Sequence, residues 1–149
     1  MKKIEEVEYY KDEILGEFIL DKEIGSYKKK FNWDGEEGSL YIDCNSDMNK
    51  TMKVIYELVN NRHWKDKIKK YAADELLDLA NEWLQDEDEP EYEEYTSDIF
   101  INKLIFESID VNEDGSFEVY YKDGDMFWGH CIIVSGNING VFEDANIAG

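Results

Sequence analysis

The chain has 149 residues, of which 36 are acidic and 16 are basic, so its formal net charge at pH 7 is −20. That length suits one domain with its own core, and a hydrophobic content of 42% excludes a disordered acidic tail. The charge excludes binding to nucleic-acid phosphates, which would be repelled. No apolar run approaches the roughly 18 residues of a membrane helix, and no apolar stretch follows the first lysines. We therefore expect a cytoplasmic protein without a signal peptide or membrane contact.

The negative charge is concentrated in one half of the chain. Residues 71–149 carry 21 acidic residues against two basic ones, whereas residues 1–70 carry 15 against 14. A field of one sign attracts ligands of the opposite sign and keeps a protein in solution. The asymmetry therefore favours a basic protein or a cation as the partner.

The first elements indicate an antiparallel meander. We interpret residues 1–15 as a charged N-terminal arm, with a short helix over its first 13 residues as the alternative. A single domain over residues 16–149 then begins with three short strands, which we predict at 16–20, 27–33 and 38–44. Gly-Ser and Asp-Gly turns separate these strands, as a meander requires.

Two helices follow in the middle of the chain. Ser46 is a suitable N-cap for the first, whose apolar residues recur at helical spacing from Met48 to Val59. The second keeps a helical period from Trp64 to Trp83, about five turns. Its lysines lie near its N-terminus and its acidic residues near its C-terminus, which is the opposite of what the helix dipole prefers. This inversion indicates either a functional surface or ordinary variation among exposed charges.

An acidic run and four further strands complete the chain. Residues 86–98 contain eight acidic residues and no basic one, which predicts a solvated loop that leads into a short helix at 97–102. The strands are expected at 104–111, 117–121, 127–134 and 141–147. Strand 127–134 is apolar on both faces, which places it centrally in a sheet. The order of elements predicts an α+β domain whose mainly antiparallel sheet has two central helices packed on it.

One segment has part of the spacing of an EF-hand calcium loop. Asp110, Asn112, Asp114 and Gly115 match the first ligand positions, but Tyr121 stands where a bidentate glutamate is required. The residues after the glycine alternate with the period of a strand, and Asp-Gly is also typical of hairpin turns. We therefore predict a hairpin turn here and no metal site.

His130 is the main candidate for catalysis. It lies in a predicted strand, and the fold could bring Asp125 or Glu107 close enough to orient it as a general base. Cys131 is excluded as its nucleophilic partner, because neighbouring residues of a strand point to opposite faces. The other interpretations of His130 are a hydrogen-bonded structural residue and a binding role together with Trp128.

The two cysteines give no sign of a metal centre. Cys44 and Cys131 lie far apart inside predicted strands, and a metal site needs more ligands at closer spacing. Disulfides are rare in a reducing compartment, so both are expected as small buried core residues. The chain has no phosphate-binding glycine loop and no familiar catalytic motif, and we expect no cofactor.

Three segments of the chain are distinctive. They are residues 16–21 (GEFILD), 71–84 (YAADELLDLANEWL) and 114–149, which contains FWGH at 127–130 and ANIAG at 145–149. Together they are similar to a bacterial family known as domain of unknown function 2262, and the resemblance covers most of the chain. It implies a compact bacterial α+β domain with no established activity or catalytic residues. It also implies a place among toxin–immunity genes, where similar domains sometimes sit.

These observations favour a non-enzymatic module that binds a basic protein, such as an immunity-type protein that neutralises a basic toxin. Electrostatic complementarity would raise the association rate and select the partner. Aromatic anchors are expected at Trp128, Tyr92 and Tyr95, since interfaces concentrate binding energy in Trp and Tyr. The steering charges are expected at Asp86, Glu87, Asp88, Glu89, Glu91, Glu93 and Glu94.

Two alternatives stay open. One is a small enzyme with a cleft around His130, Asp125 and Glu107. The other is a cation-binding module that uses the acidic turns. A variant of His130 that abolished an activity while the melting temperature stayed unchanged would favour the enzyme.

Overall fold

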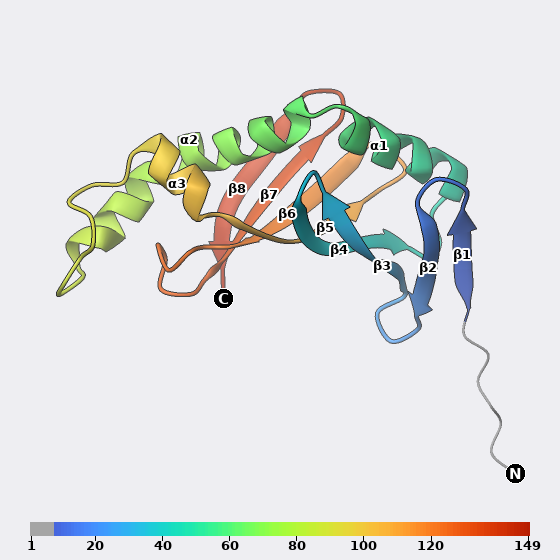
Figure 1. Ribbon diagram of the computed structural model, residues 1–149, viewed down its shortest axis with the longest axis horizontal. Coiled ribbons are helices and arrows are strands. Elements are labelled where there is room, and N and C mark those ends of the chain that lie inside the picture. Colours follow the sequence, from blue (N-terminus) through green and yellow to red (C-terminus); the bar gives the residue numbers. More distant parts are fainter. Residues whose placement is uncertain (1–7) are drawn as a thin grey trace, which may run out of the picture.

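Within residues 8–149, which the computed structural model describes, eight strands form one sheet and three helices lie against it (Figure 1). Neighbouring strands follow the order of the chain, and all pairs are antiparallel except β4 with β5. The strands are β1 (Tyr9–Asp12), β2 (Gly16–Asp21), β3 (Ser26–Trp33), β4 (Glu36–Asp43), β5 (Ile105–Val111), β6 (Ser116–Lys122), β7 (Cys131–Asn137) and β8 (Phe142–Ala148). The helices are α1 (Met48–Asn60), α2 (His63–Gln85) and α3 (Ser97–Lys103).

The parallel pair explains where the helices lie. Two parallel neighbours cannot be joined by a tight turn, so the chain passes from β4 to β5 through all three helices. Figure 1 shows α1 and α2 along the same face of the sheet, and α3 packs against α2. The α+β class and the mainly antiparallel sheet are thus confirmed. Three helices rather than two accompany the sheet, because the short helix expected at 97–102 forms as α3.

The core lies between the sheet and the helices. In β6, Phe117, Val119 and Tyr121 are buried, and the residues between them lie on the other face. From the helix side Trp64 packs edge-on against Phe117, with their ring centroids 6.0 Å apart. Burying a large apolar side chain contributes about 1.5–3 kcal/mol, so this layer contributes most of the fold's stability.

Two of the lysines at the start of α2 have a structural explanation. Lys65 and Lys69, near the start of the helix, donate to the two carboxylate oxygens of Glu36 in β4 at 2.9 and 2.7 Å. Burial raises the pKa of Glu36, but the hydrogen bonds from the two lysines outweigh it and hold that pKa below its ordinary value. A lysine near a helix N-terminus costs about 0.3–1 kcal/mol of stability through the helix dipole. Two partly buried charge-assisted hydrogen bonds contribute more stability than this cost.

Two element boundaries differ from those expected. Asp47 rather than Ser46 caps α1, because its carboxylate accepts the amide of Lys50 at 3.2 Å. Part of the charged segment expected as an N-terminal arm forms β1, which pairs with β2 along its whole length. The remainder of that segment, residues 1–7, lies outside the described residues.

The strand predicted at 127–134 is wrong at its start. Strand β7 begins at Cys131, and residues 127–130 belong to the loop before it. The backbone of this loop is held in turns by the carboxylate of Asp123, which takes amide hydrogens that a strand would use. β7 also lies next to the edge strand β8 rather than at the centre of the sheet.

Candidate functional site

One buried carboxylate organises the loop between β6 and β7, residues 123–130. Asp123 is 3% exposed, and it accepts the amide hydrogens of Asp125 at 2.9 Å, Phe127 at 2.8 Å and Gly129 at 3.0 Å. A buried charge is costly unless it is hydrogen-bonded, and three donors meet that need. Asp123 was not predicted as a site residue from the sequence, although an aspartate before closely spaced glycines is a signal for such a loop.

The loop contains an unusual run of left-handed backbone conformations. Gly124 and Gly129 have positive φ angles of 58° and 92°. Two residues that are not glycine also have positive φ angles, Asp125 at 69° and Trp128 at 57°. Aspartate tolerates this region, whereas a large aromatic residue rarely adopts it, and the cost is about 1–2 kcal/mol. Strain of this kind persists only where the surroundings impose it, and it is often found at functional sites.

Trp128 is the exposed apolar tip of the loop. It is 56% exposed, and its ring lies 4.7 Å from that of Trp83, near the end of α2. Trp83 also contacts Phe127 and His130, at 5.5 and 5.3 Å between ring centroids. Trp83 was not predicted as part of a site, because its position on the apolar face of a helix is typical of a core residue. Trp83 therefore packs against three rings of the loop and holds the exposed tryptophan against the helix.

The three residues proposed for catalysis line one cleft. Glu107, Asp125 and His130 surround a cavity of about 390 Å³ beside the loop. Glu107 reaches this cleft because β5 has a bulge between Phe106 and Ser108. The ring nitrogen Nδ1 of His130 donates to the carbonyl oxygen of Phe127, so the neutral ring has Nε2 as its acceptor. No hydrogen bond joins His130 to either carboxylate within residues 8–149.

Cys131 lines the same cleft but is poorly suited to nucleophilic chemistry. Burial, followed by the negative charge of Glu107, raises the pKa of its thiol, and the thiol is the unreactive form. The expectation that both cysteines are core residues is wrong, since Cys44 and Cys131 are half-buried free thiols. The strand argument that separated Cys131 from His130 also fails, because His130 precedes β7.

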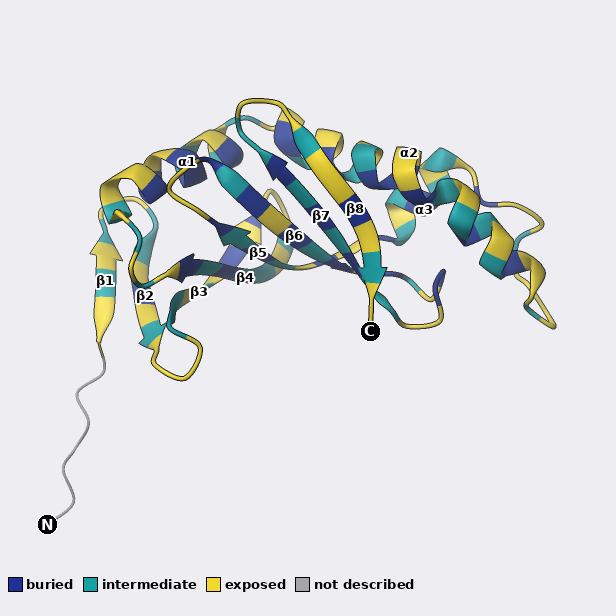
Figure 2. Ribbon diagram, turned by 180° about the vertical axis from the view of Figure 1, so that it is seen from behind, coloured by how far each residue is buried: buried dark blue, intermediate teal, exposed yellow. Residues whose placement is uncertain are grey.

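The acidic run leaves α2 as an exposed loop at the same end of the molecule as Trp128 (Figure 1). Asn81 of α2 fixes the loop: its side chain donates to the carbonyl of Tyr95 at 3.1 Å and accepts the amide of Tyr95 at 2.7 Å. Figure 2 shows the loop as almost continuously exposed. Glu87 is half-buried, and the exposed carboxylates are those of Asp86, Asp88, Glu89, Glu91, Glu93 and Glu94.

The two tyrosines of this loop differ from the expectation of exposed anchors. Tyr95 is 5% exposed, so its ring belongs to the core and cannot contact a partner. Burial and the nearby charge of Glu87 raise its pKa. Tyr92 is half-buried, with the ammonium of Lys103 lying 5.2 Å from its ring centroid. Trp128 is therefore the exposed aromatic side chain of this end of the molecule.

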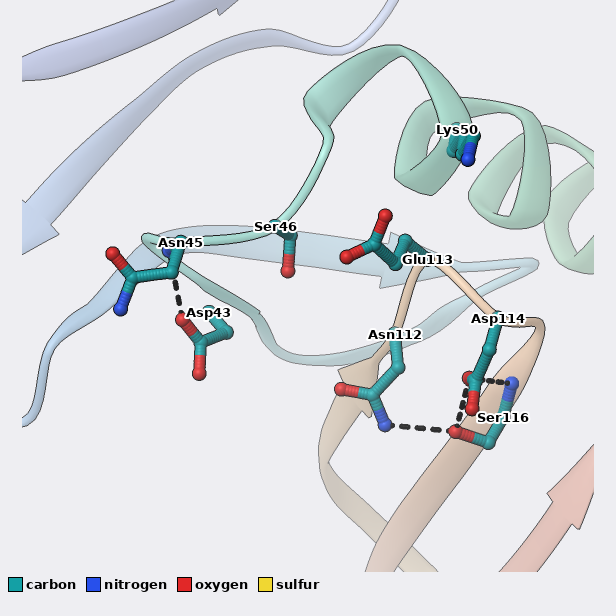
Figure 3. Close-up of a pocket in the computed structure, with 8 residues that line it drawn as sticks. All are labelled: Asp43, Asn45, Ser46, Lys50, Asn112, Glu113, Asp114 and Ser116. Atoms are coloured by element: carbon teal, nitrogen blue, oxygen red, sulfur yellow. Dashed lines mark hydrogen bonds between the residues drawn. The ribbon is translucent and has the colours of Figure 1, made fainter.

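The segment with partial EF-hand spacing forms the hairpin turn that we predicted. Asp114 accepts hydrogen bonds from the amide and hydroxyl of Ser116 at 2.9 and 2.6 Å, and the side chain of Asn112 donates to the same hydroxyl at 3.0 Å. Figure 3 shows these groups turned toward one another beside a hollow of about 620 Å³, below Lys50 of α1. The carboxylate of Asp114 thus caps the start of β6.

A protein-family model matches residues 12–147, nearly the whole described chain. The family is described as an uncharacterized protein conserved in bacteria (DUF2262). The chain belongs to this family, which confirms the resemblance seen in the sequence. No curated protein and no solved structure matches it. No helix in residues 8–149 of this DUF2262 member is long and apolar enough to cross a membrane.

Proposed function

We propose that this DUF2262 protein is a non-enzymatic binding module that uses the end formed by Trp128 and the acidic loop to dock a basic protein surface. The observation that supports this most is Trp128, which is exposed and strained yet packed on the ring of Trp83. Interfaces concentrate their binding energy in such tryptophans. An anchor that is already ordered also loses little conformational entropy on binding.

The acidic loop gives the proposed surface its selectivity. Six exposed carboxylates lie between residues 86 and 94, at the same end of the molecule as the tryptophan. Charges at the rim of an interface act mainly on the association rate and on the choice of partner. A basic protein, such as a toxin that an immunity-type protein neutralises, fits this arrangement.

The test compares two pairs of charge reversals in the full-length chain. The first variant combines Glu89→Lys and Glu91→Lys in the acidic loop. The second combines Glu17→Lys and Glu23→Lys, at exposed positions on β2 and in the turn after it, and alters the net charge by the same amount. With a basic protein that the wild-type chain captures from its bacterial source as the probe, we expect the first pair to slow association about tenfold at low salt and the second pair to change it little. Equal effects of the two pairs, or association insensitive to salt, would overturn the proposal.

The second candidate is a small enzyme, which one observation favours: Glu107, Asp125 and His130 line one cleft, and the Phe127 carbonyl fixes the ring. A general base needs such an orienting partner. In a panel of hydrolysis and isomerisation assays, loss of an activity in His130→Gln with an unchanged melting temperature would support this candidate. An activity retained by His130→Gln would exclude the role of base for this residue.

A further inference from the structure

The face of the sheet opposite the helices carries a row of side chains that no described helix covers (Figure 1). Strand pairing aligns Ile19, Lys28, Tyr41, Asp110 and Glu118 across β2 to β6. The sequence neighbours of Tyr41, Asp110 and Glu118 are buried in the core, so this row lies on the open face. None of these five residues belongs to the loop of Trp128, residues 123–130, or to the acidic loop.

A hollow of about 360 Å³ lies in the middle of this face. Tyr41 and Tyr120 are half-buried in its wall, together with Ser108 and Asp110. At its edge stands Ile24, which is 57% exposed. An exposed apolar rim around aromatic and polar groups is typical of an interaction surface rather than of a solvated sheet face.

The hollow has an excess of negative charge. Asp110 and Glu118 lie directly opposite each other across β5 and β6, an arrangement that destabilises a sheet. The hydroxyl of Tyr120 donates to Glu118 at 2.7 Å, and a hydroxyl has one hydrogen to give. Burial and then the charge of Glu118 raise the pKa of Asp110, against the Tyr120 hydroxyl that lowers it. A cationic group from outside would relieve this repulsion.

The same face already holds one cation on an aromatic ring. The ammonium of Lys28 lies 5.5 Å from the ring centroid of Tyr41, within the range of a cation–π contact. The opposite side of the hollow offers Tyr120 and Asp110 but no described lysine or arginine. Charge complementarity therefore favours a positively charged occupant.

We propose that this open face is a second docking surface, which takes a basic segment of a protein with one arginine side chain seated in the hollow between Tyr41 and Tyr120 and paired with Asp110. The planar guanidinium suits both the carboxylate and the aromatic walls, and Ile24 at the rim contacts apolar parts of the segment. The lining of this hollow shares no residue with the Trp128 loop or the acidic loop, so each surface can be changed by substitutions that leave the other intact.

The test is a titration of the isotope-labelled full chain, followed by NMR, with the peptide acetyl-Gly-Arg-Gly-amide. Its counterpart with citrulline, which has the same shape without the charge, is the control ligand. We expect the arginine peptide to shift the signals of Tyr41, Ser108 and Tyr120, and the citrulline peptide to leave them unchanged. Equal shifts with both peptides, or shifts confined to Trp128 and its loop, would overturn the proposal.

Two variants of equal charge sharpen the test. Asp110→Asn is expected to weaken binding at least about tenfold, as the loss of a charge-assisted hydrogen bond does. Asp144→Asn, on the same face at the far strand β8, is expected to change it less than about twofold because Asp144 does not line the hollow. Asp110→Asn also removes the like-charge pair, so its melting temperature should rise, which separates lost binding from lost folding.

Tyr41→Leu is a further variant, and we expect it to weaken binding of the arginine peptide about threefold. Unchanged affinity in both Asp110→Asn and Tyr41→Leu would overturn the proposal.

Discussion

The two acidic turns on either side of strand β6 have different structures. The turn before β6 contains Asp114-Gly115 and reverses the chain at once, whereas the turn after β6 contains Asp123-Gly124 and delays the next strand until Cys131. Asp114 is exposed, and its carboxylate accepts hydrogen bonds from the amide and the hydroxyl of Ser116. Asp123 is buried and holds three amides, up to six residues away. Burial of the aspartate carboxylate thus distinguishes the loop that carries the exposed tryptophan from the simple hairpin turn.

The largest difference is expected when each aspartate is removed. Asp123→Ala leaves three amides of a partly buried loop without their acceptor and should lower the free energy of unfolding by about 3 kcal/mol or more. Asp114→Ala is the matched control in the exposed turn and should cost about 0.5–1 kcal/mol. Urea unfolding of both variants measures the two values. Similar losses would show that burial of the carboxylate does not distinguish the turns.

The glycines after the two aspartates should differ in the same direction. A Cβ at Gly124 would lie 2.5 Å from the backbone carbonyl oxygen of Lys103, which cannot move aside, and one at Gly115 would lie 2.8 Å from the side chain of Asn137, which can. Both glycines have a left-handed backbone, with φ of 58° and 93°. We expect Gly124→Ala to cost about 3 kcal/mol and Gly115→Ala about 1–2 kcal/mol. Thermal unfolding checks the order, and the reverse order would contradict it.

Backbone strain at Trp128 should have a smaller effect on stability, and it should reverse the usual order of alanine and glycine. Trp128→Ala and Trp128→Gly both lose the contact with Trp83, but only glycine is at ease at φ of 57°. Trp128→Gly should therefore be more stable than Trp128→Ala by about 1 kcal/mol, although glycine elsewhere is the less stable choice. A stability order of alanine above glycine in chemical denaturation would remove the evidence for strain.

The smallest effect is the pH response of the exposed turn. The Ser116 hydroxyl, and then its amide, lower the pKa of Asp114 below the ordinary 3.8. A lowered pKa in the folded state means that this contribution is fully present above about pH 4 and is lost as the pH falls through the folded-state pKa. The stability difference between the wild type and Asp114→Asn should therefore shrink on acidification. A difference that is constant down to about pH 2.5 would contradict the hydrogen-bond assignment.

Periodicity predicted the parts of the fold in which side chains alternate between core and solvent. The helical face from Trp64 to Trp83 and the alternation in β6 were both read correctly, since burial imposes those patterns. The strand at 127–134 failed because its apolar residues Phe127 and Trp128 serve a loop, one as its buried base and the other as its exposed tip. A hydrophobicity pattern cannot distinguish these roles from those of a strand buried on both faces.

The candidate site was only partly predictable, because its key contacts join distant segments. His130, Asp125 and Glu107 do line one cleft, but the bulge that brings Glu107 there has no local signal in the sequence. Trp83 and Trp128 were read as members of separate elements, and only the packing of α2 on the loop joins them. The lysines at the start of α2 were noticed, yet Glu36, which binds two of them, lies in β4.

The most direct test of the central claim is the dissociation rate of a Trp128→Gly variant from a basic protein that the wild-type chain captures from its bacterial source, compared with that of Glu17→Gln, an exposed change on β2. If Trp128 is the anchor, its loss should speed dissociation about 30-fold or more, as for other interface tryptophans, while Glu17→Gln dissociates like the wild type. The association rates should remain similar, because the acidic loop is intact. A Trp128→Gly variant that dissociates as slowly as the wild type would contradict the claim.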